Sequence, residues 1–203
     1  MKLYSSPASP FARKVRIVAH ELGLPLEVLD VATANNEELR RVNPLGKIPV
    51  LILDDGSALF DSPVICEYLN DKGNGKFFPG TSLWSTTSGR WRALMLQALG
   101  DGICDAAVSR VVEGRLPIEK QNGDMIARHL DAVTRGLDAL ERACAKFAEF
   151  PTIGEIAAGC ALGYLDFRLP ELQWRATRPQ LAAWVEKFNN YASVRATQPA
   201  NLK

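Results

Sequence analysis

Two Ser-Pro pairs are the first residues in this sequence whose types and placement could support chemistry. Ser9-Pro10 follows the candidate strand 2–6, and Ser62-Pro63 follows the candidate strand 58–60. Serine is a common N-cap residue and proline is favoured at the first helical position, so we predict that each pair begins a helix. The start of a helix presents free backbone N–H groups and the positive end of the helix dipole, which together favour anions.

Both pairs would lie where a strand ends and a helix begins, which is where open α/β sheets usually bind ligands. Two such positions at neighbouring strand ends would suit a small ligand with two separated negative groups. As ordinary N-caps, the same serines would each stabilise a helix by about 1 kcal/mol without any ligand. The residue pattern alone leaves the choice between these two roles open.

The segment Gly46-Lys47-Ile48-Pro49-Val50 is a third candidate feature, because it places a proline in an apolar strand pattern. Proline has no N–H for the strand ladder, so Pro49 belongs at a strand start or a sheet edge. A cis bond before Pro49 would be a deliberate turn. That arrangement would leave the backbone of Ile48 free to pair with an extended, peptide-like ligand.

The elements that must position these residues form two different halves. In the first 80 residues, hydrophobic spacing and turn residues predict strands at 2–6, 26–31, 48–53 and 58–60, and helices at 10–22, at 35–42 and after Ser62. The first strand, helix and second strand would form a right-handed, parallel βαβ unit. The first half is therefore predicted to be a small mixed sheet flanked by helices.

After residue 80 the sequence contains helix signals only. The polar residues 81–88 predict a linker, and residues 89–203 predict an all-helical domain. Thr152 and Glu155 have the spacing of a capping box, and the helix they open is apolar on nearly every face, so we expect it at the centre of the helical domain. A last helix is predicted from Pro179. We thus predict two domains, 1–80 and 89–203.

The composition argues against several classes of protein. Hydrophobic residues make up 47% and charged residues 23% of the 203 residues, as in soluble globular proteins, and 24 basic residues balance 23 acidic ones. Nucleic-acid and membrane-surface binders usually carry a charge excess, so we expect neither partner. The four cysteines form no CxxC pair and the two histidines are far apart, which predicts reduced thiols, a cytoplasmic protein and no metal site.

In combination, these motifs resemble the soluble glutathione S-transferase superfamily, with the N-terminal motif of its bacterial, Ser-type, theta/zeta/omega-like members. The resemblance is carried by SPFARKVRI, by GKIPVL with DSPVICEYL, and by PTIGEIA, and it spans essentially the whole chain. It implies the GST fold, an α/β thioredoxin-like N-terminal domain followed by an all-α C-terminal domain, and a homodimer. Its co-substrate would be glutathione, a tripeptide with two carboxylates and one thiol.

The resemblance implies that Ser9 is the catalytic residue. Its hydroxyl would donate a hydrogen bond to the glutathione sulfur and, with the helix dipole, lower the thiol pKa from roughly 8.5. Relatives with cysteine at this position form mixed disulfides, which a serine cannot do. Some transferase classes use a tyrosine near the end of the first strand instead, so Tyr4 is the alternative.

Five further residues are implied to bind glutathione. Ile48 and Pro49 match a Val-cis-Pro pair whose backbone pairs with the cysteinyl part. Asp61 and Ser62 match an acidic-Ser pair that holds the γ-glutamyl end. Lys47 would meet the glycyl carboxylate.

The implied function is glutathione transfer in detoxification, in which the bound thiolate attacks an electrophilic small molecule in a cleft between the domains. The second substrate would contact the helix that runs from about Arg90 through Arg110. Two alternatives stay open: a glutathione-dependent isomerase, and a non-catalytic partner-binding protein with the same fold.

Overall fold

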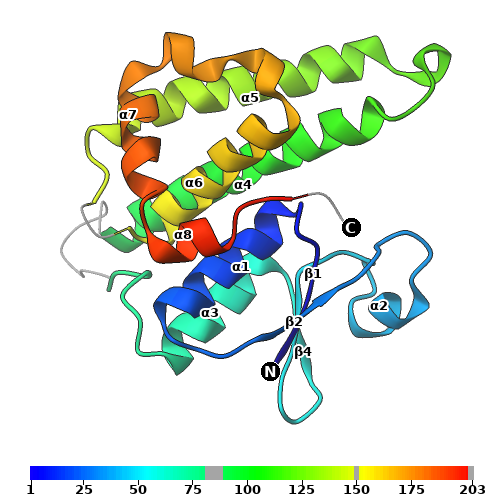
Figure 1. Cartoon of the computed structure of the whole chain (residues 1–203), viewed down its shortest axis with the longest axis vertical. Coiled ribbons are helices and arrows are strands. Elements are labelled where there is room, and N and C mark those ends of the chain that lie inside the picture. The colour runs from blue at the N-terminus through cyan, green and yellow to red at the C-terminus, as the bar shows by residue number, and fades with distance from the viewer. Residues whose placement is uncertain (81–88, 149–150, 201–203) are drawn as a thin grey trace.

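The N-terminal domain is built on a four-stranded mixed sheet (Figure 1). The computed structural model describes residues 1–80, 89–148 and 151–200; the predicted linker 81–88 lies outside the described residues. In the order β2-β1-β3-β4, the strands are β1 (Lys2–Ser5), β2 (Glu27–Asp30), β3 (Val50–Ile52) and β4 (Ala58–Leu59). β1 pairs in parallel with β2 and antiparallel with β3, which confirms the predicted βαβ unit.

Helices cover both faces of this sheet. They are α1 (Pro10–Glu21), α2 (Glu37–Val42) and α3 (Ser62–Lys72). Alternation along β1 sends Leu3 into the core shared with α1 and α3, while the hydroxyl of Tyr4 reaches Glu38 of α2. Accordingly, α1 and α3 lie side by side between the sheet and the helical domain, and α2 lies on the other side of the sheet (Figure 1).

The predicted start of α1 is confirmed, and the predicted start of α3 is wrong by one residue. The Ser9 hydroxyl accepts a hydrogen bond from the Ala12 N–H at 3.2 Å, as an N-cap does. In α3 the N-cap is Asp61, whose carbonyl accepts from the Ile65 N–H at 3.0 Å, and Ser62 is already helical. Because the helix begins one residue earlier, the Ser62 side chain lies in its first turn and not at its cap.

The predicted strand 48–53 is longer than the observed β3, which spans Val50–Ile52. Pro49 has no N–H to donate, so the ladder with β1 begins after it. At the other end, the Leu53 N–H bonds to the Ser57 carbonyl and turns the chain into β4. The bond between Ile48 and Pro49 is cis.

The rest of the described chain is helical, which confirms the thioredoxin-like plus all-α fold. The helices are α4 (Gly89–Glu113), α5 (Gly123–Cys144), α6 (Ile153–Arg168), α7 (Pro179–Phe188) and the short α8 (Ala192–Ala196), which the sequence pattern did not predict. α4 and α5 form a long antiparallel pair, α6 packs against α4, and α8 lies beside α1 (Figure 1). Within the described ranges, no helix has both the length and the apolar composition needed to cross a bilayer.

The capping box before α6 is confirmed. The Thr152 hydroxyl accepts from the Gly154 N–H at 3.2 Å, and the Glu155 carboxylate accepts from the Thr152 N–H at 2.9 Å. The helix that this box opens is buried along most of its length. Its residues Ile153, Ile156 and Cys160 belong to the same apolar core as Leu3 and Val15, so the core of the sheet domain includes side chains from the helical domain.

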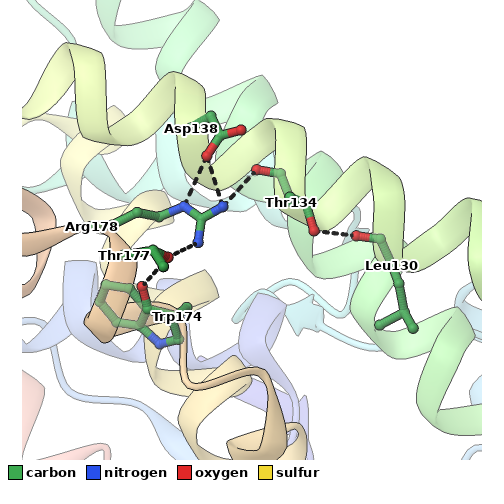
Figure 2. Close-up of polar contacts among 6 residues, drawn as sticks. All are labelled: Leu130, Thr134, Asp138, Trp174, Thr177 and Arg178. Atoms are coloured by element: carbon green, nitrogen blue, oxygen red, sulfur yellow. Dashed lines mark hydrogen bonds and ion pairs between the residues drawn. The ribbon is translucent and has the colours of Figure 1, made fainter.

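Polar side chains of α5 fix the position of α7. Arg178, just before α7, donates to one Asp138 carboxylate oxygen from Nε at 3.1 Å and from Nη2 at 2.7 Å, and also reaches the Thr134 carbonyl at 3.4 Å (Figure 2). Glu141 caps α7 from outside by accepting from the N–H groups of Gln180 and Leu181, at 3.1 and 2.7 Å. The N-terminus of α7 is therefore satisfied by another helix and not by its own N-cap.

Because α4 and α6 pack closely, we expect alanine substitutions at two glycines of α4 to affect stability differently. A Cβ at Gly100 would lie 2.7 Å from the Ala157 carbonyl carbon, whereas a Cβ at Gly102 would meet nothing within 4 Å. We expect Gly100→Ala to lower the free energy of unfolding by about 2 kcal/mol, because the α6 backbone must shift. The control, Gly102→Ala, should be neutral or stabilising by up to about 1 kcal/mol. Urea unfolding tests both, and equal stability of the two variants would contradict the close packing.

Candidate functional site

A cleft of about 830 Å³ lies between the two domains. On the first domain it is lined by residues 8–11 at the start of α1, by residues 31–34 after β2 and by residues 46–48 before β3. The helical wall comes from α4, the start of α5 and the end of α6. Three of the predicted site residues, Ser9, Lys47 and Ile48, are thus brought together from separate segments of the chain.

Ser9 is the N-cap of α1, and its geometry is also compatible with the functional role that the sequence left open. Its oxygen accepts the capping hydrogen bond from Ala12, which leaves the hydroxyl hydrogen available to a second partner. Pro10 has no N–H, and the Phe11 N–H has no hydrogen-bond partner in the described part of the chain. The start of α1 therefore offers the cleft a hydroxyl donor and a free backbone donor at the positive end of a helix.

Asn43 holds the loop that brings Lys47 and Ile48 to the cleft. Its buried side chain donates to the Lys47 carbonyl at 2.8 Å and accepts from the Leu45 N–H at 3.0 Å. Gly46, with a φ of +62°, completes the turn in a conformation that favours glycine. Within the described residues, the backbone groups of Ile48 form no hydrogen bond with other backbone groups, so this edge is open to an extended ligand.

The other three predicted residues, Pro49, Asp61 and Ser62, are not among the residues that line the cleft. Pro49 and Ser62 are buried, and Asp61 is exposed at the start of α3. Asp61 is nevertheless electrostatically coupled to Asp105, a cleft residue of α4. Burial raises the pKa of the Asp105 carboxyl, the positive charge of Lys47 lowers it, and the negative charge of Asp61 raises it. The charges of Lys47 and Asp61 therefore both act on this carboxyl at the α4 wall.

The tyrosine that the sequence offered as an alternative to Ser9 is engaged elsewhere. The Tyr4 hydroxyl donates to a Glu38 carboxylate oxygen at 2.6 Å, and Tyr4 is not part of the cleft lining. The hydrogen bond to Glu38, together with burial and the charge of Glu38, raises the pKa of Tyr4. Its geometry therefore favours a link between β1 and α2 over contact with a ligand.

The sequence analysis did not identify the helical wall of the cleft. Its α4 part extends from Asp105 through Glu113, with members spaced 3 and 4 residues apart, so helical periodicity could have located this face. The expected contact helix, 90–110, overlaps this wall but ends too early. The remaining members come from the turn after α4 and from α5 and α6: Arg115, Met125, His129, Tyr164 and Arg168. Nothing in the local pattern marks these five residues.

Known proteins share both halves of this arrangement. The family model for the glutathione S-transferase N-terminal domain matches residues 8–72, and the model for the C-terminal domain matches residues 124–187. The chain is 34% identical over 204 residues to the uncharacterized GST-like protein YibF of Escherichia coli K12, and the alignment covers 98% of both chains. The chain belongs to the glutathione S-transferase superfamily.

Solved structures of relatives place glutathione on this fold. A glutathione transferase family member from Pseudomonas fluorescens Pf-5 with bound glutathione is 40% identical to this chain, with a TM-score of 0.86 and 98% coverage of both chains. A glutathione S-transferase from Methylobacillus flagellatus KT with bound glutathione is 38% identical, with a TM-score of 0.89 and coverage of 98% of this chain and 99% of that one. The Pseudomonas protein is also known with bound S-(propanoic acid)-glutathione, at a TM-score of 0.81.

The cysteines of this protein are poor candidates for nucleophiles. All four are free and buried. Burial raises the pKa of Cys66 to about 12 and that of Cys160 to about 11. The described residues also contain no group of three or more His, Cys, Asp or Glu side chains that could hold a metal ion.

We expect these thiols to be unreactive in the folded protein. At about pH 8, Ellman's reagent should modify at most Cys144, the least buried of the four, within minutes, because a thiol with a raised pKa is rarely ionised. In denaturant all four should react. Rapid reaction of two or more thiols in the folded protein would contradict the burial.

A buried ion pair joins the two walls of the cleft. The Lys14 ammonium, on α1, lies 2.6 and 2.7 Å from the two carboxylate oxygens of Asp101, on α4. The Lys14 side chain is 1% exposed and that of Asp101 is 19% exposed. Burial raises the pKa of Asp101, although Lys14 acts to lower it.

We expect Lys14→Met to lower the free energy of unfolding by about 3 kcal/mol, because it leaves a buried carboxylate without its partner. Adding Asp101→Leu should restore most of the loss, and Lys120→Met, at an exposed lysine, should change little. In the single variant the Asp101 pKa stays above its unfolded value, so the folded state binds the extra proton. The loss in free energy of unfolding, relative to wild type, should therefore become smaller as the pH falls from about 7 towards about 4. Urea unfolding across this range tests the pair, and a deficit that grows on acidification would contradict it.

Proposed function

We propose that this protein is a glutathione transferase that holds glutathione as a thiolate beside Ser9 and promotes its attack on an electrophilic small molecule. The observation that carries the proposal is the meeting of Ser9 with the open Ile48 edge in one cleft. Glutathione binding is supported by the relatives that contain it at 38–40% identity over nearly the full chain. The transfer reaction and its residues are the proposed part.

Ser9 would act as a hydrogen-bond donor and not as a base. Its oxygen already accepts from Ala12, so its hydrogen is free to be donated to the glutathione sulfur. A charge-assisted hydrogen bond and the α1 dipole would both favour the thiolate over the thiol. The sulfur then needs no further activation to displace a leaving group from carbon.

The remaining groups of glutathione would be held by polar residues around the sulfur. The Ile48 backbone, turned by cis Pro49, would pair with the cysteinyl part. The N-terminus of α3 at Ser62 would bind the γ-glutamyl carboxylate, and Asp61 would bind the neighbouring ammonium. Lys47, exposed at the cleft, would meet the glycyl carboxylate.

We further propose that the enzyme works as a cytoplasmic homodimer. Large apolar side chains remain exposed on α3 and α4 of the single chain, namely Val64, Trp91 and Met95, and a second copy would cover them. Four free cysteines agree with a reducing compartment.

Titration of the protein with glutathione across pH tests the proposal. We expect the ultraviolet thiolate band to grow to saturation, with a midpoint pH below that of free glutathione. Ser9→Ala should reduce this band and lower kcat/KM by about ten- to a hundredfold, as loss of a hydrogen bond to a charged group predicts, while glutathione affinity changes less.

Tyr4→Phe is the matched control, because its hydroxyl is occupied by Glu38. It should leave the thiolate band and turnover unchanged. Full activity in the Ser9→Ala variant together with loss of activity in the Tyr4→Phe variant would transfer the catalytic role to Tyr4. Failure of the wild-type protein to bind glutathione would overturn the proposed function as a whole.

A further inference from the structure

The cleft lining includes two arginines that the proposed binding of glutathione does not use. Arg115 follows the end of α4, and Arg168 is the last residue of α6; both line the same cleft as Ser9. Arginine stays charged at any physiological pH and presents a planar fork of N–H donors that matches a carboxylate. The two side chains, one in the turn after α4 and one at the end of α6, line the same cleft, and both charges act on Tyr164.

Arg115 is available to a ligand. Its side chain is exposed, and in the part of the chain that the structure describes its guanidinium forms no ion pair or hydrogen bond. Glu113, two residues earlier, has a carboxylate oxygen 2.7 Å from the Asn122 N–H, which fixes that carboxylate against the start of α5. Asp105, the other acidic cleft residue on α4, is separated from Glu113 by about 12 Å of helix and is coupled to Lys47.

Tyr164 supports Arg168 without neutralising it. The two residues are one turn apart on α6, and Arg168 is hydrogen-bonded to the Tyr164 hydroxyl. Burial raises the pKa of Tyr164, although the charges of Arg168 and Arg115 lower it. The phenol therefore stays neutral at physiological pH and adds no negative charge beside the arginines.

Apolar side chains also line the cleft. Along α4, Val108 and Val112 line the cleft between Asp105 and the turn that carries Arg115, and Met125 faces it from the start of α5. The cleft lining thus combines the proposed sulfur position, apolar side chains and two arginines. A small neutral electrophile would leave Arg115 without a partner in the described part of the chain.

We infer that the second substrate is an electrophile with an apolar body and a carboxylate, and that Arg115 binds this carboxylate, with the positive charge of Arg168 contributing from the same cleft lining. The inference rests on the proposed function, because it assumes that glutathione places its sulfur beside Ser9. The apolar body would lie against Val108 and Val112. Arg115 is then a specificity-determining residue that takes no part in activating the thiol.

Binding of two glutathione conjugates, measured by calorimetry, tests the inference without requiring turnover. The probes are S-(para-carboxybenzyl)glutathione and its neutral para-carbamoyl analogue, with unsubstituted glutathione measured in parallel. We expect the carboxylate to bind about fivefold to tenfold more tightly than the amide, as a partly exposed charged pair predicts. Arg115→Met should abolish most of this preference, and Arg115→Lys should retain part of it.

Arg142→Met is the matched control, because it removes one exposed arginine from α5 outside the cleft lining. It should keep the preference for the carboxylate, and neither this variant nor Arg115→Met should change the affinity for unsubstituted glutathione. Equal binding of the two conjugates by wild-type protein that binds glutathione would overturn this inference and leave the proposed function intact. Equal loss of preference in Arg142→Met and Arg115→Met would show a general charge effect and would also overturn it. Absence of glutathione binding would overturn both proposals.

Discussion

The ion pair between Lys14 and Asp101 is the contact on which the arrangement of the cleft depends. It joins α1, which begins at Ser9, to α4, which supplies the opposite wall. Both charges are largely withdrawn from water, so each requires the other, and the two helices cannot separate without exposing an unpaired charge. The Lys14–Asp101 ion pair therefore holds the proposed sulfur site opposite the helical wall.

Apolar packing also joins α1 to both domains. Val15 and Val18 pack on the sheet core, which also contains Ile156 and Cys160 of α6. The Arg13 guanidinium is buried at the same interface, where it donates to the Val194 carbonyl at 3.3 Å and lies where a Cβ at Gly163 would be. This continuous packing makes the cleft a fixed feature between two domains that share a core, which suits the positioning of two substrates.

Local patterns predicted the elements better than their ends. Hydrophobic periodicity, turn residues and caps are short-range signals, so α1, the βαβ unit and the capping box at Thr152 and Glu155 agree with the structure. The start of α3 was misplaced because Asp61 and Ser62 are both good cap residues, and their order alone does not decide between them. The short α8 has no strong pattern of its own and is held by its contact with α1.

By itself, the sequence determined the family and the two kinds of domain, because these depend on motifs that are contiguous along the chain. The same motifs predicted Ser9, Lys47 and Ile48 as site residues, and the structure brings these three to one cleft. Only the tertiary structure decided which helical residues face Ser9. Arg115, Tyr164 and Arg168 come from segments more than 100 residues away from Ser9, and their approach follows from how α4 and α6 pack on α1. The tertiary structure also decided that Lys14 is buried. A lysine on an amphipathic helix is usually exposed to solvent, and the sequence around Lys14 does not show that Asp101 of another helix pairs with it.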